Sequence, residues 1–242
     1  NKDSLHLLGI MTHRVMFVTG TGTGSGKTVL TALLLYHLRS RGIDALAMKP
    51  VCTGPRDDVH LLQSIQGSRL SDDLINPFYY KEPAVPVVAS RRYKTQVTIE
   101  GVIKSIDRVR SHCDILFVEG AGGLMVPLNE SGHTWADLLK QSGWPVIVAA
   151  SNELGVINHI LLTVDKLKCT GINEISVSLI NTQKKTKKNI PERTNYGELA
   201  KNLKKIPIVE VPNIGTGVAK KAKIAQGAKK IEKTLAQILK TV

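Results

Sequence analysis

One glycine-rich segment, GTGTGSGKT at residues 20–28, restricts the fold more than any other part of the sequence. It follows an apolar run at residues 15–19 and precedes a stretch at residues 27–41 in which apolar residues recur at helical spacing. Glycines let main-chain N–H groups approach an anion closely, and the N-terminus of the following helix favours negative charge. A strand, this loop and a helix in that order predict a phosphate-binding turn in an α/β sheet.

The end of this segment suits phosphate and metal chemistry. Lys27 can reach the β- and γ-phosphates of a nucleotide, and Thr28 can hold Mg²⁺. The usual pattern places its first glycine five residues before the Gly of Gly-Lys-Thr, where this chain has Thr21. With Gly20 the spacing is one residue longer, so the loop is a variant. A glycine-rich turn with a helix cap is the alternative interpretation.

The remaining sequence repeats the alternation of short apolar runs and longer amphipathic stretches, which is typical of βαβ units. We expect strands at residues 15–19, 45–48, 115–118, 146–150, 175–180 and 208–211. We expect helices at residues 27–41, 59–66, 99–110, 134–141, 156–167 and 196–203. Right-handed crossovers would make the strands parallel. The predicted fold class is α/β, a P-loop-type, mostly parallel sheet with helices on both faces.

Length and composition favour one domain. A chain of 242 residues with 42% hydrophobic residues can bury a large core, which Val, Ile, Leu and Ala must build because aromatics are only 4%. We expect residues 14–242 to form a single P-loop α/β domain that ends in a basic helix, and residues 1–13 to be an N-terminal extension without a functional role. A run of about 18 apolar residues and a secretion signal are both missing, so we expect a cytoplasmic location.

The net charge of +13 is concentrated in the C-terminal quarter. Residues 184–242 hold fifteen Lys and Arg against four acids, whereas the first 183 residues hold eighteen against sixteen. Such a block can bind nucleic acid or a membrane surface, but this one has almost no interleaved aromatics. Alanine, isoleucine and leucine separate its lysines at helical spacing. We therefore expect a solvated surface helix, and neither a nucleic-acid nor a membrane partner.

Polar residues stand directly after several predicted strands. Lys49, Glu119, Asn181 and Pro212 each follow an apolar run. Ligands of open α/β sheets bind beyond the carboxyl ends of the strands, so we expect these residues to share one rim with the glycine-rich loop. A carboxylate directly after a buried strand is costly without a partner, which favours a functional role for Glu119.

Two further charged residues have a functional and a plain interpretation. Asp58 begins a predicted helix and can add an oxygen ligand to Mg²⁺, but an acidic helix start is stabilising without any function. Lys49 stands before Pro50, which directs the chain out of the sheet, and can neutralise a transferring phosphoryl group. By itself it is equally consistent with a surface lysine.

Five segments together carry a closer resemblance. FVTGTGTGSGKT, MKPVCTG, RDDVHLLQ, VEGAGGLMVPL and ELGVINHILLT have the order, and roughly the spacing, of the dethiobiotin synthetase family, which the chain resembles from about residue 14 to residue 214. The resemblance implies a homodimeric ligase of biotin biosynthesis with ATP and Mg²⁺ as cofactors. Its substrates would be 7,8-diaminopelargonic acid and CO₂ or bicarbonate. A carbamate would form, take the γ-phosphate and be attacked by the second amine, which closes the ring.

The same resemblance implies roles for individual residues. Lys27 and Lys49 would be catalytic, and Thr28, Asp58 and Glu119 would hold Mg²⁺. ATP would contact Gly24, Ser25, Gly26, Lys27, Thr28 and Val29, with Asn181, Pro212, Asn213 and Ile214 at its base. The diamine or its carbamate would contact Thr23, Thr53, Gly122, Gly123 and Leu124, with Gly155, Val156 and Asn158 seating its carboxylate tail across the dimer interface. Many family members carry an acid where this chain has Gly24.

Two other functions fit parts of the sequence. A P-loop switch ATPase of the partitioning type would use the basic tail to bind DNA or membrane, but it has no need of the segments KPVCTG and EGAGGLMVP. A carboxylate-amidating synthetase would bring a glutaminase domain with a Cys nucleophile, and none is visible. No Ser-His-Asp or Cys-His signature is present, and we interpret His159 as a residue of helix packing or of an interface.

Overall fold

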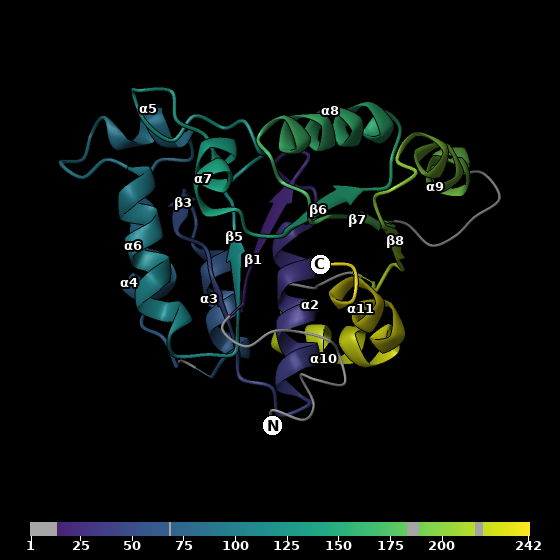
Figure 1. The fold of residues 1–242 in the computed structure, drawn as a ribbon. Coiled ribbons are helices and arrows are strands. Elements are labelled where there is room, and N and C mark those ends of the chain that lie inside the picture. The colour runs from purple at the N-terminus through teal and green to yellow at the C-terminus, as the bar shows by residue number, and fades with distance from the viewer. Residues whose placement is uncertain (1–13, 68, 183–188, 216–219) are drawn as a thin grey trace.

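The computed structural model describes residues 14–67, 69–182, 189–215 and 220–242. Six parallel strands form the main sheet in the order β2-β5-β1-β6-β7-β8 (Figure 1). They are β1 (Arg14–Gly20), β2 (Ala45–Met48), β5 (Ile115–Glu119), β6 (Val146–Ser151), β7 (Ile175–Ile180) and β8 (Ile208–Val211). All six predicted strands are confirmed, each to within one residue at either end.

The central strand β1 shows why helices must cover both faces of the sheet. Its side chains alternate between two core clusters, with Val15 and Phe17 in one and Met16 and Val18 in the other. All four are nearly or fully buried. A strand that is apolar on both faces is stable only between two layers of helices.

Two sets of helices supply these layers (Figure 1). The cluster with Met16 contains residues of α2 (Lys27–Arg39), α3 (Asp57–Ile65), α10 (Lys221–Lys230) and α11 (Glu232–Leu239). The cluster with Val15 contains residues of α6 (Ile99–Arg110), α7 (Trp135–Ser142), α8 (Val156–Cys169) and α9 (Ile190–Asn202). The predicted fold class, a parallel sheet with helices on both faces, is therefore confirmed.

Several short elements were not predicted. β3 (Val51–Thr53) and β4 (Phe78–Tyr80) form a separate two-stranded parallel sheet, and α4 (Asp72–Ile75) and α5 (Pro86–Ser90) are single turns beside it. Strands of three residues carry too few side chains to show a period. Helix α9 also starts six residues before its predicted start, because the Asn189 side chain accepts a hydrogen bond from the Glu192 N–H and caps it.

The prediction of one basic C-terminal helix is wrong in detail. Ile231, at φ −114° and ψ 27°, separates α10 from α11. The apolar residues Ile224, Leu235 and Ile238 of the two helices are fully buried against the α2 side of the sheet. Six of the lysines in this stretch lie between residues 220 and 233, and all six are exposed: Lys220, Lys221, Lys223, Lys229, Lys230 and Lys233. The expected solvated lysine face is thus confirmed. No helix within the described ranges is long and apolar enough to cross a membrane.

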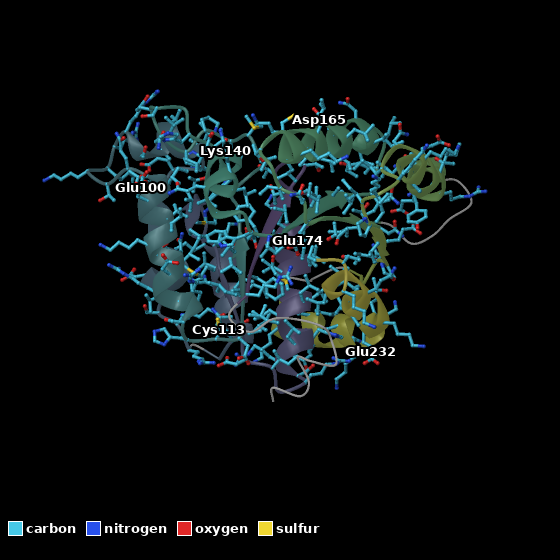
Figure 2. The ribbon with its side chains drawn as sticks, viewed as in Figure 1. Glu100, Cys113, Lys140, Asp165, Glu174 and Glu232 are labelled. Atoms are coloured by element: carbon cyan, nitrogen blue, oxygen red, sulfur yellow. The ribbon has the colours of Figure 1, made fainter. Side chains whose placement is uncertain are left out.

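An ion pair joins α11 to the turn that follows α2. Glu232 at the start of α11, labelled in Figure 2, accepts a hydrogen bond from Arg41 at 3.2 Å. Both side chains are largely exposed, so this pair adds little to stability. The two helices are held in place mainly by their buried apolar stripe, which includes Ile224, Leu235 and Ile238.

Candidate functional site

The glycine-rich loop between β1 and α2 closes tightly on itself and against β7. A Cβ at Gly20 would lie 2.0 Å from Ser25 Oγ. Gly26 has a φ of 88°, and a Cβ there would lie 2.6 Å from the Ile180 Cδ1. Helix α2 begins at the next residue and has no side-chain cap, so its first N–H groups remain available to an anion.

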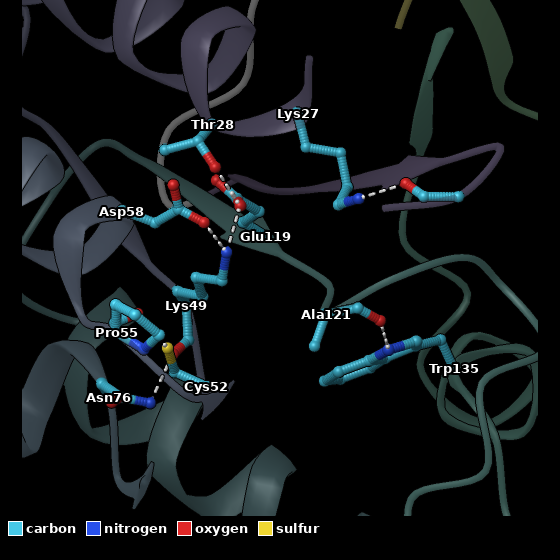
Figure 3. Close-up of polar contacts among 11 residues, drawn as sticks. Lys27, Thr28, Lys49, Cys52, Pro55, Asp58, Asn76, Glu119, Ala121 and Trp135 are labelled. Carbon is cyan, nitrogen blue, oxygen red and sulfur yellow. Dashed lines mark hydrogen bonds and ion pairs between the residues drawn. The ribbon is translucent and has the colours of Figure 1, made fainter. Parts of the chain in front are cut away.

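Four charged or polar side chains meet beside this loop (Figure 3). Lys49, just after β2, donates a hydrogen bond to Oε1 of Glu119 at 2.9 Å and forms an ion pair with Asp58 of α3. Thr28 Oγ1 donates to the same Glu119 oxygen at 2.6 Å. Lys27 Nζ lies apart from them and donates to the main-chain oxygen of Gly22 at 2.8 Å. The structure therefore joins Thr28, Lys49, Asp58 and Glu119 through hydrogen bonds and ion pairs, whereas Lys27 bonds to its own loop.

The two lysines of this cluster have opposite pKa shifts. The pKa of Lys27 is lowered to about 8, mainly by burial; the charge of Glu119 opposes this shift, and the charge of Lys49 adds to it. Burial also acts against the charge of Lys49, but the carboxylates of Glu119 and Asp58 outweigh it and raise the pKa of this lysine. Lys49 is a fixed cation, whereas Lys27 titrates just above neutral pH when no ligand is bound.

The surroundings of Glu119 fit a divalent cation. Its side chain is fully buried, and within the described residues Oε2 has no hydrogen-bond partner. Asp58 and the Thr28 hydroxyl are the other oxygen donors at this place. No group of three or more His, Cys, Asp or Glu side chains in the described part of the chain could hold a metal. Mg²⁺, which keeps several waters and takes few carboxylates, fits such a site once phosphate oxygens complete it.

Two cavities adjoin at the loop. The first, of about 280 Å³, is lined by Thr23, Gly24, Gly26, Lys27, Thr28, Val29, Lys49, Asp58 and Gly122. The second, of about 200 Å³, has more apolar walls and includes Gly24, Gly26, Val29, Leu30, Leu33, Asn181, Pro212, Asn213 and Ile214. They share Gly24, Gly26 and Val29. Together they suit a ligand with an anionic part and a flat apolar part, which describes a nucleotide.

The other predicted substrate residues lie outside these cavity walls. Gly123 packs closely against the loop, where a Cβ would lie 3.5 Å from the Gly20 main-chain oxygen, and Leu124 is buried. Thr53 is half-buried at the end of β3. Ser25, which was predicted to contact ATP, is buried and lines neither cavity.

The predicted tail-binding segment stands at the start of α8. Gly155 caps this helix at a φ of 92° and Val156 is buried in the core, whereas Asn158 and His159 are exposed. Because its side chain is exposed, His159 does not pack in the core of its own chain, and its interface role stays a prediction.

Fold and site together define a P-loop nucleotide-binding α/β protein. A protein-family model described as an AAA domain matches residues 14–218. The MinC:MinD cell division complex and MinD alone, both from Aquifex aeolicus, superpose with TM-scores of 0.56 and 0.55 over 91% of this chain and 96% and 97% of theirs. Their sequence identity is 14%, so this likeness shows a shared fold alone.

Curated relatives are more specific, and three of them are each named ATP-dependent dethiobiotin synthetase BioD. The protein of Thermodesulfovibrio yellowstonii is 36% identical over 82% of this chain and 86% of its own length. The Bacillus velezensis protein is 33% identical over 82% and 85%, and the Methanocaldococcus jannaschii protein 37% identical over 66% and 76%. This chain belongs to the dethiobiotin synthetase family, as the sequence motifs predicted.

Proposed function

We propose that this protein is an ATP- and Mg²⁺-dependent cyclo-ligase that converts 7,8-diaminopelargonic acid and CO₂ to dethiobiotin in biotin biosynthesis. The observation that carries the proposal is the convergence of Lys27, Lys49, Thr28, Asp58 and Glu119 beside two adjoining cavities. Membership of the dethiobiotin synthetase family supports it. A switch ATPase would bind the nucleotide in the same cavities but has no need of the segments KPVCTG and EGAGGLMVP.

The reaction divides into three bond-forming steps. One amine nitrogen attacks CO₂ and loses a proton, which leaves a carbamate. A carbamate oxygen then attacks the γ-phosphorus of ATP, the bond to the β-phosphate oxygen breaks, and ADP departs. The second amine attacks the carbamate carbon, the carbon–oxygen bond to phosphate breaks, and the nitrogen loses a proton. One oxygen of CO₂ thus leaves in inorganic phosphate, and the ureido ring is closed.

Electrostatic positioning is the main contribution of the protein. The carbamate and the γ-phosphate are both anionic, so cations must bring them together. Lys27 donates to the main-chain oxygen of Gly22 in the phosphate loop, and Lys49 lines the phosphate cavity together with the predicted substrate residue Thr23. Mg²⁺ held by Thr28, Asp58 and Glu119 would neutralise charge that develops on the phosphate oxygens. Amines and carbamates are nucleophiles already, so no acid-base dyad is required.

At the other end of the nucleotide, the base would lie in the apolar cavity. Asn181 would read the adenine, and Pro212, Asn213 and Ile214 would cover it, as in the resemblance that the sequence carries. Gly24 to Val29 would surround the phosphates through main-chain N–H groups. The diamine would lie beside Thr23 and Gly122 in the phosphate cavity.

The enzyme is proposed to act as a homodimer through α8. Leu154 and Leu162 are 88% and 63% exposed, and exposed apolar side chains at the entry to α8 and on it support the proposal. The exposed Asn158 and His159 lie on the same helix. A dimer across this face would let Gly155 to Asn158 seat the carboxylate tail of the substrate. Cytoplasmic location and the lack of nucleic-acid and membrane partners stay predictions from the sequence.

The test is a reconstituted reaction. Pure protein is incubated with the diamine, ¹³C-bicarbonate, Mg²⁺ and ATP, and the product is analysed by mass spectrometry. We expect dethiobiotin that carries the label in its ureido carbonyl, and no product when the diamine, Mg²⁺ or ATP is omitted. ATP hydrolysis that needs no diamine and rises with DNA would instead identify a switch ATPase.

A further inference from the structure

Three buried asparagines connect α9 to the base cavity. Asn152 follows β6, Asn181 follows β7 and lines the cavity, and Asn195 lies on α9; they are 1%, 4% and 6% exposed. The Asn195 Nδ2 donates a hydrogen bond to the Asn152 Oδ1 at 2.9 Å. The Asn152 Nδ2 in turn donates to the Asn181 Oδ1 at 2.8 Å. We call these three residues the amide relay.

Two main-chain oxygens fix the direction of the amide relay. The Asn195 Nδ2 also donates to the main-chain oxygen of Glu153 at 3.1 Å, and the Asn152 Nδ2 to that of Glu192 at 3.3 Å. A carbonyl oxygen can only accept, so each of these amides must keep its NH₂ group on that side. Reversing either amide would place two acceptors against each other.

The relay therefore determines how the Asn181 amide is oriented. Its Oδ1 accepts from Asn152, while no hydrogen bond among the described residues uses its Nδ2. An oxygen has two lone pairs, so Oδ1 can still accept one further hydrogen bond. Asn181 thus presents to the base a donor beside an acceptor, in one fixed order.

We infer that Asn152 and Asn195 are positioning residues that make the enzyme select a 6-amino purine over a 6-oxo purine. This rests on the proposed function, in which Asn181 reads the base. Adenine offers an amino donor beside a ring-nitrogen acceptor, and an asparagine of fixed orientation pairs with both. A 6-oxo purine turns an oxygen toward the Asn181 Oδ1, so two acceptors meet. Neither Asn152 nor Asn195 lines the base cavity.

A freely turning Asn181 would not discriminate in this way. Rotation of its amide by half a turn exchanges the donor and the acceptor, and a side-chain amide on a surface does this at little cost. In the buried relay, the same rotation would break the bond to Asn152 and leave a buried polar group unpaired. The selectivity is consequently set by residues on other elements than β7.

The experiment measures equilibrium binding of Mg·ATP and Mg·ITP by calorimetry, because these nucleotides differ in the 6-position of the base. We expect the wild-type protein to bind ATP tighter than ITP by about tenfold or more. Asn152→Leu, which has nearly the same shape without donor or acceptor, should lower this ratio by about fivefold. Asn195 does not touch Asn181 and acts on it only through Asn152. Asn195→Leu should therefore lower the ratio of ATP to ITP affinity by only about twofold.

Gln66→Leu is the matched control. Gln66 is another buried carboxamide, 1% exposed, that exchanges hydrogen bonds with the main chain of Ala47 at 2.9 and 3.3 Å. It supports β2, at the opposite edge of the sheet from β7 and β8. This variant should lose comparable stability in thermal unfolding and keep the wild-type ratio of ATP to ITP affinity.

The outcomes separate the inference from the proposed function. Binding needs no diamine, so it is measured whether or not ring closure occurs. If Asn152→Leu does not fold, Asn195→Leu alone decides, because its α9 position is further from the sheet. An ATP:ITP ratio that is unchanged in the folded relay variants, or lowered equally by Gln66→Leu, would overturn the inference even in an active synthetase.

Discussion

The two ends of the nucleotide cavity are built from different chemistry. At the phosphate end, Lys27, Lys49 and Glu119 are charged. The Coulomb energy between charges depends on their distance and hardly on the angle at which they meet. At the base end, the amide relay is neutral and acts through directional hydrogen bonds. We therefore expect changes at the phosphate end to alter rate for any triphosphate, and changes at the base end to alter which triphosphate is used.

The largest effect should come from the phosphate end. Lys27→Ala removes a cation from a reaction that depends on electrostatic stabilisation, so we expect turnover to fall on the order of 10²-fold or more. Steady-state dethiobiotin formation measures this. The exposed Lys223→Ala is the control and should keep full activity. Near-normal turnover of Lys27→Ala would show that the loop does not act on the γ-phosphate.

The second prediction tests the proposed metal ligand. Glu119→Gln keeps the size and one acceptor oxygen for Thr28 and Lys49 but removes a buried charge. We expect a folded protein whose Mg²⁺ requirement rises by roughly 10- to 100-fold, measured by titrating Mg²⁺ at saturating ATP. An unchanged Mg²⁺ dependence would make Glu119 a structural partner of Lys49 alone.

These two residues also show what the sequence could reveal. Glu119 ends the apolar strand β5 and Lys49 follows the apolar strand β2, so their place on the rim follows from the parallel order of the sheet. The six long strands were predictable for the same reason, because each has enough residues to show its period. That Lys49 bonds to both Asp58 and Glu119 depends on side-chain geometry, which a strand order does not give.

The base end was less predictable. Asn152 also follows a strand directly, and this signal was available in the sequence, but Asn195 lies inside a helix whose first turn was missed. Its partner is 43 residues away, so no local spacing connects them. The break at Ile231 was likewise hidden, since the lysine and alanine pattern continues through it. Long-range packing, rather than period, determines these features.

The third prediction concerns pH and again separates the two ends. The pKa of Lys27 is about 8 in the free protein, so above that pH the loop loses its charge. Binding of ATP must then take up a proton, and we expect affinity to fall by about tenfold between pH 8 and pH 9.5, measured by calorimetry. The ATP:ITP ratio should stay constant over this range. In Lys27→Ala this pH dependence should disappear.

Deprotonation of Lys27 weakens ATP binding as the pH rises, but it increases the free energy of unfolding. The unfolded chain keeps the lysine protonated up to its ordinary pKa of 10.5, so between pH 8 and 10.5 it binds more protons than the folded chain. This group alone therefore makes the free energy of unfolding rise with pH in that window. The difference in unfolding free energy between the wild-type protein and Lys27→Ala isolates this contribution, and a difference that does not rise with pH would contradict the assignment to Lys27.

A smaller effect on nucleotide affinity is expected where Gly227 of α10 packs against Ile214, a wall residue of the base cavity. A Cβ at Gly227 would lie 2.9 Å from Cδ1 and 3.2 Å from Cβ of Ile214, so Gly227→Ala must displace a wall of the base cavity. We expect ATP affinity to weaken by about threefold, while the helix preference of alanine offsets the strain by about 1 kcal/mol. Gly197→Ala on α9 is the control, because nothing lies within 4 Å of its new methyl group. It should leave nucleotide binding unchanged.

The smallest effect is expected from the basic charge of the C-terminal helices. The six exposed lysines that precede and follow Gly227 line neither cavity, and salt screens exposed charges beyond about 8 Å at physiological ionic strength. Changing Lys220, Lys221, Lys223, Lys229, Lys230 and Lys233 together to Gln should leave turnover within about twofold, because the buried stripe stays intact.

Leu235→Ala in that stripe should instead lower the free energy of unfolding by about 2–5 kcal/mol. Turnover and DNA binding are measured side by side. A steep, salt-sensitive affinity for DNA that disappears together with function in the Gln variant would assign the lysines to a nucleic-acid partner and overturn the synthetase interpretation.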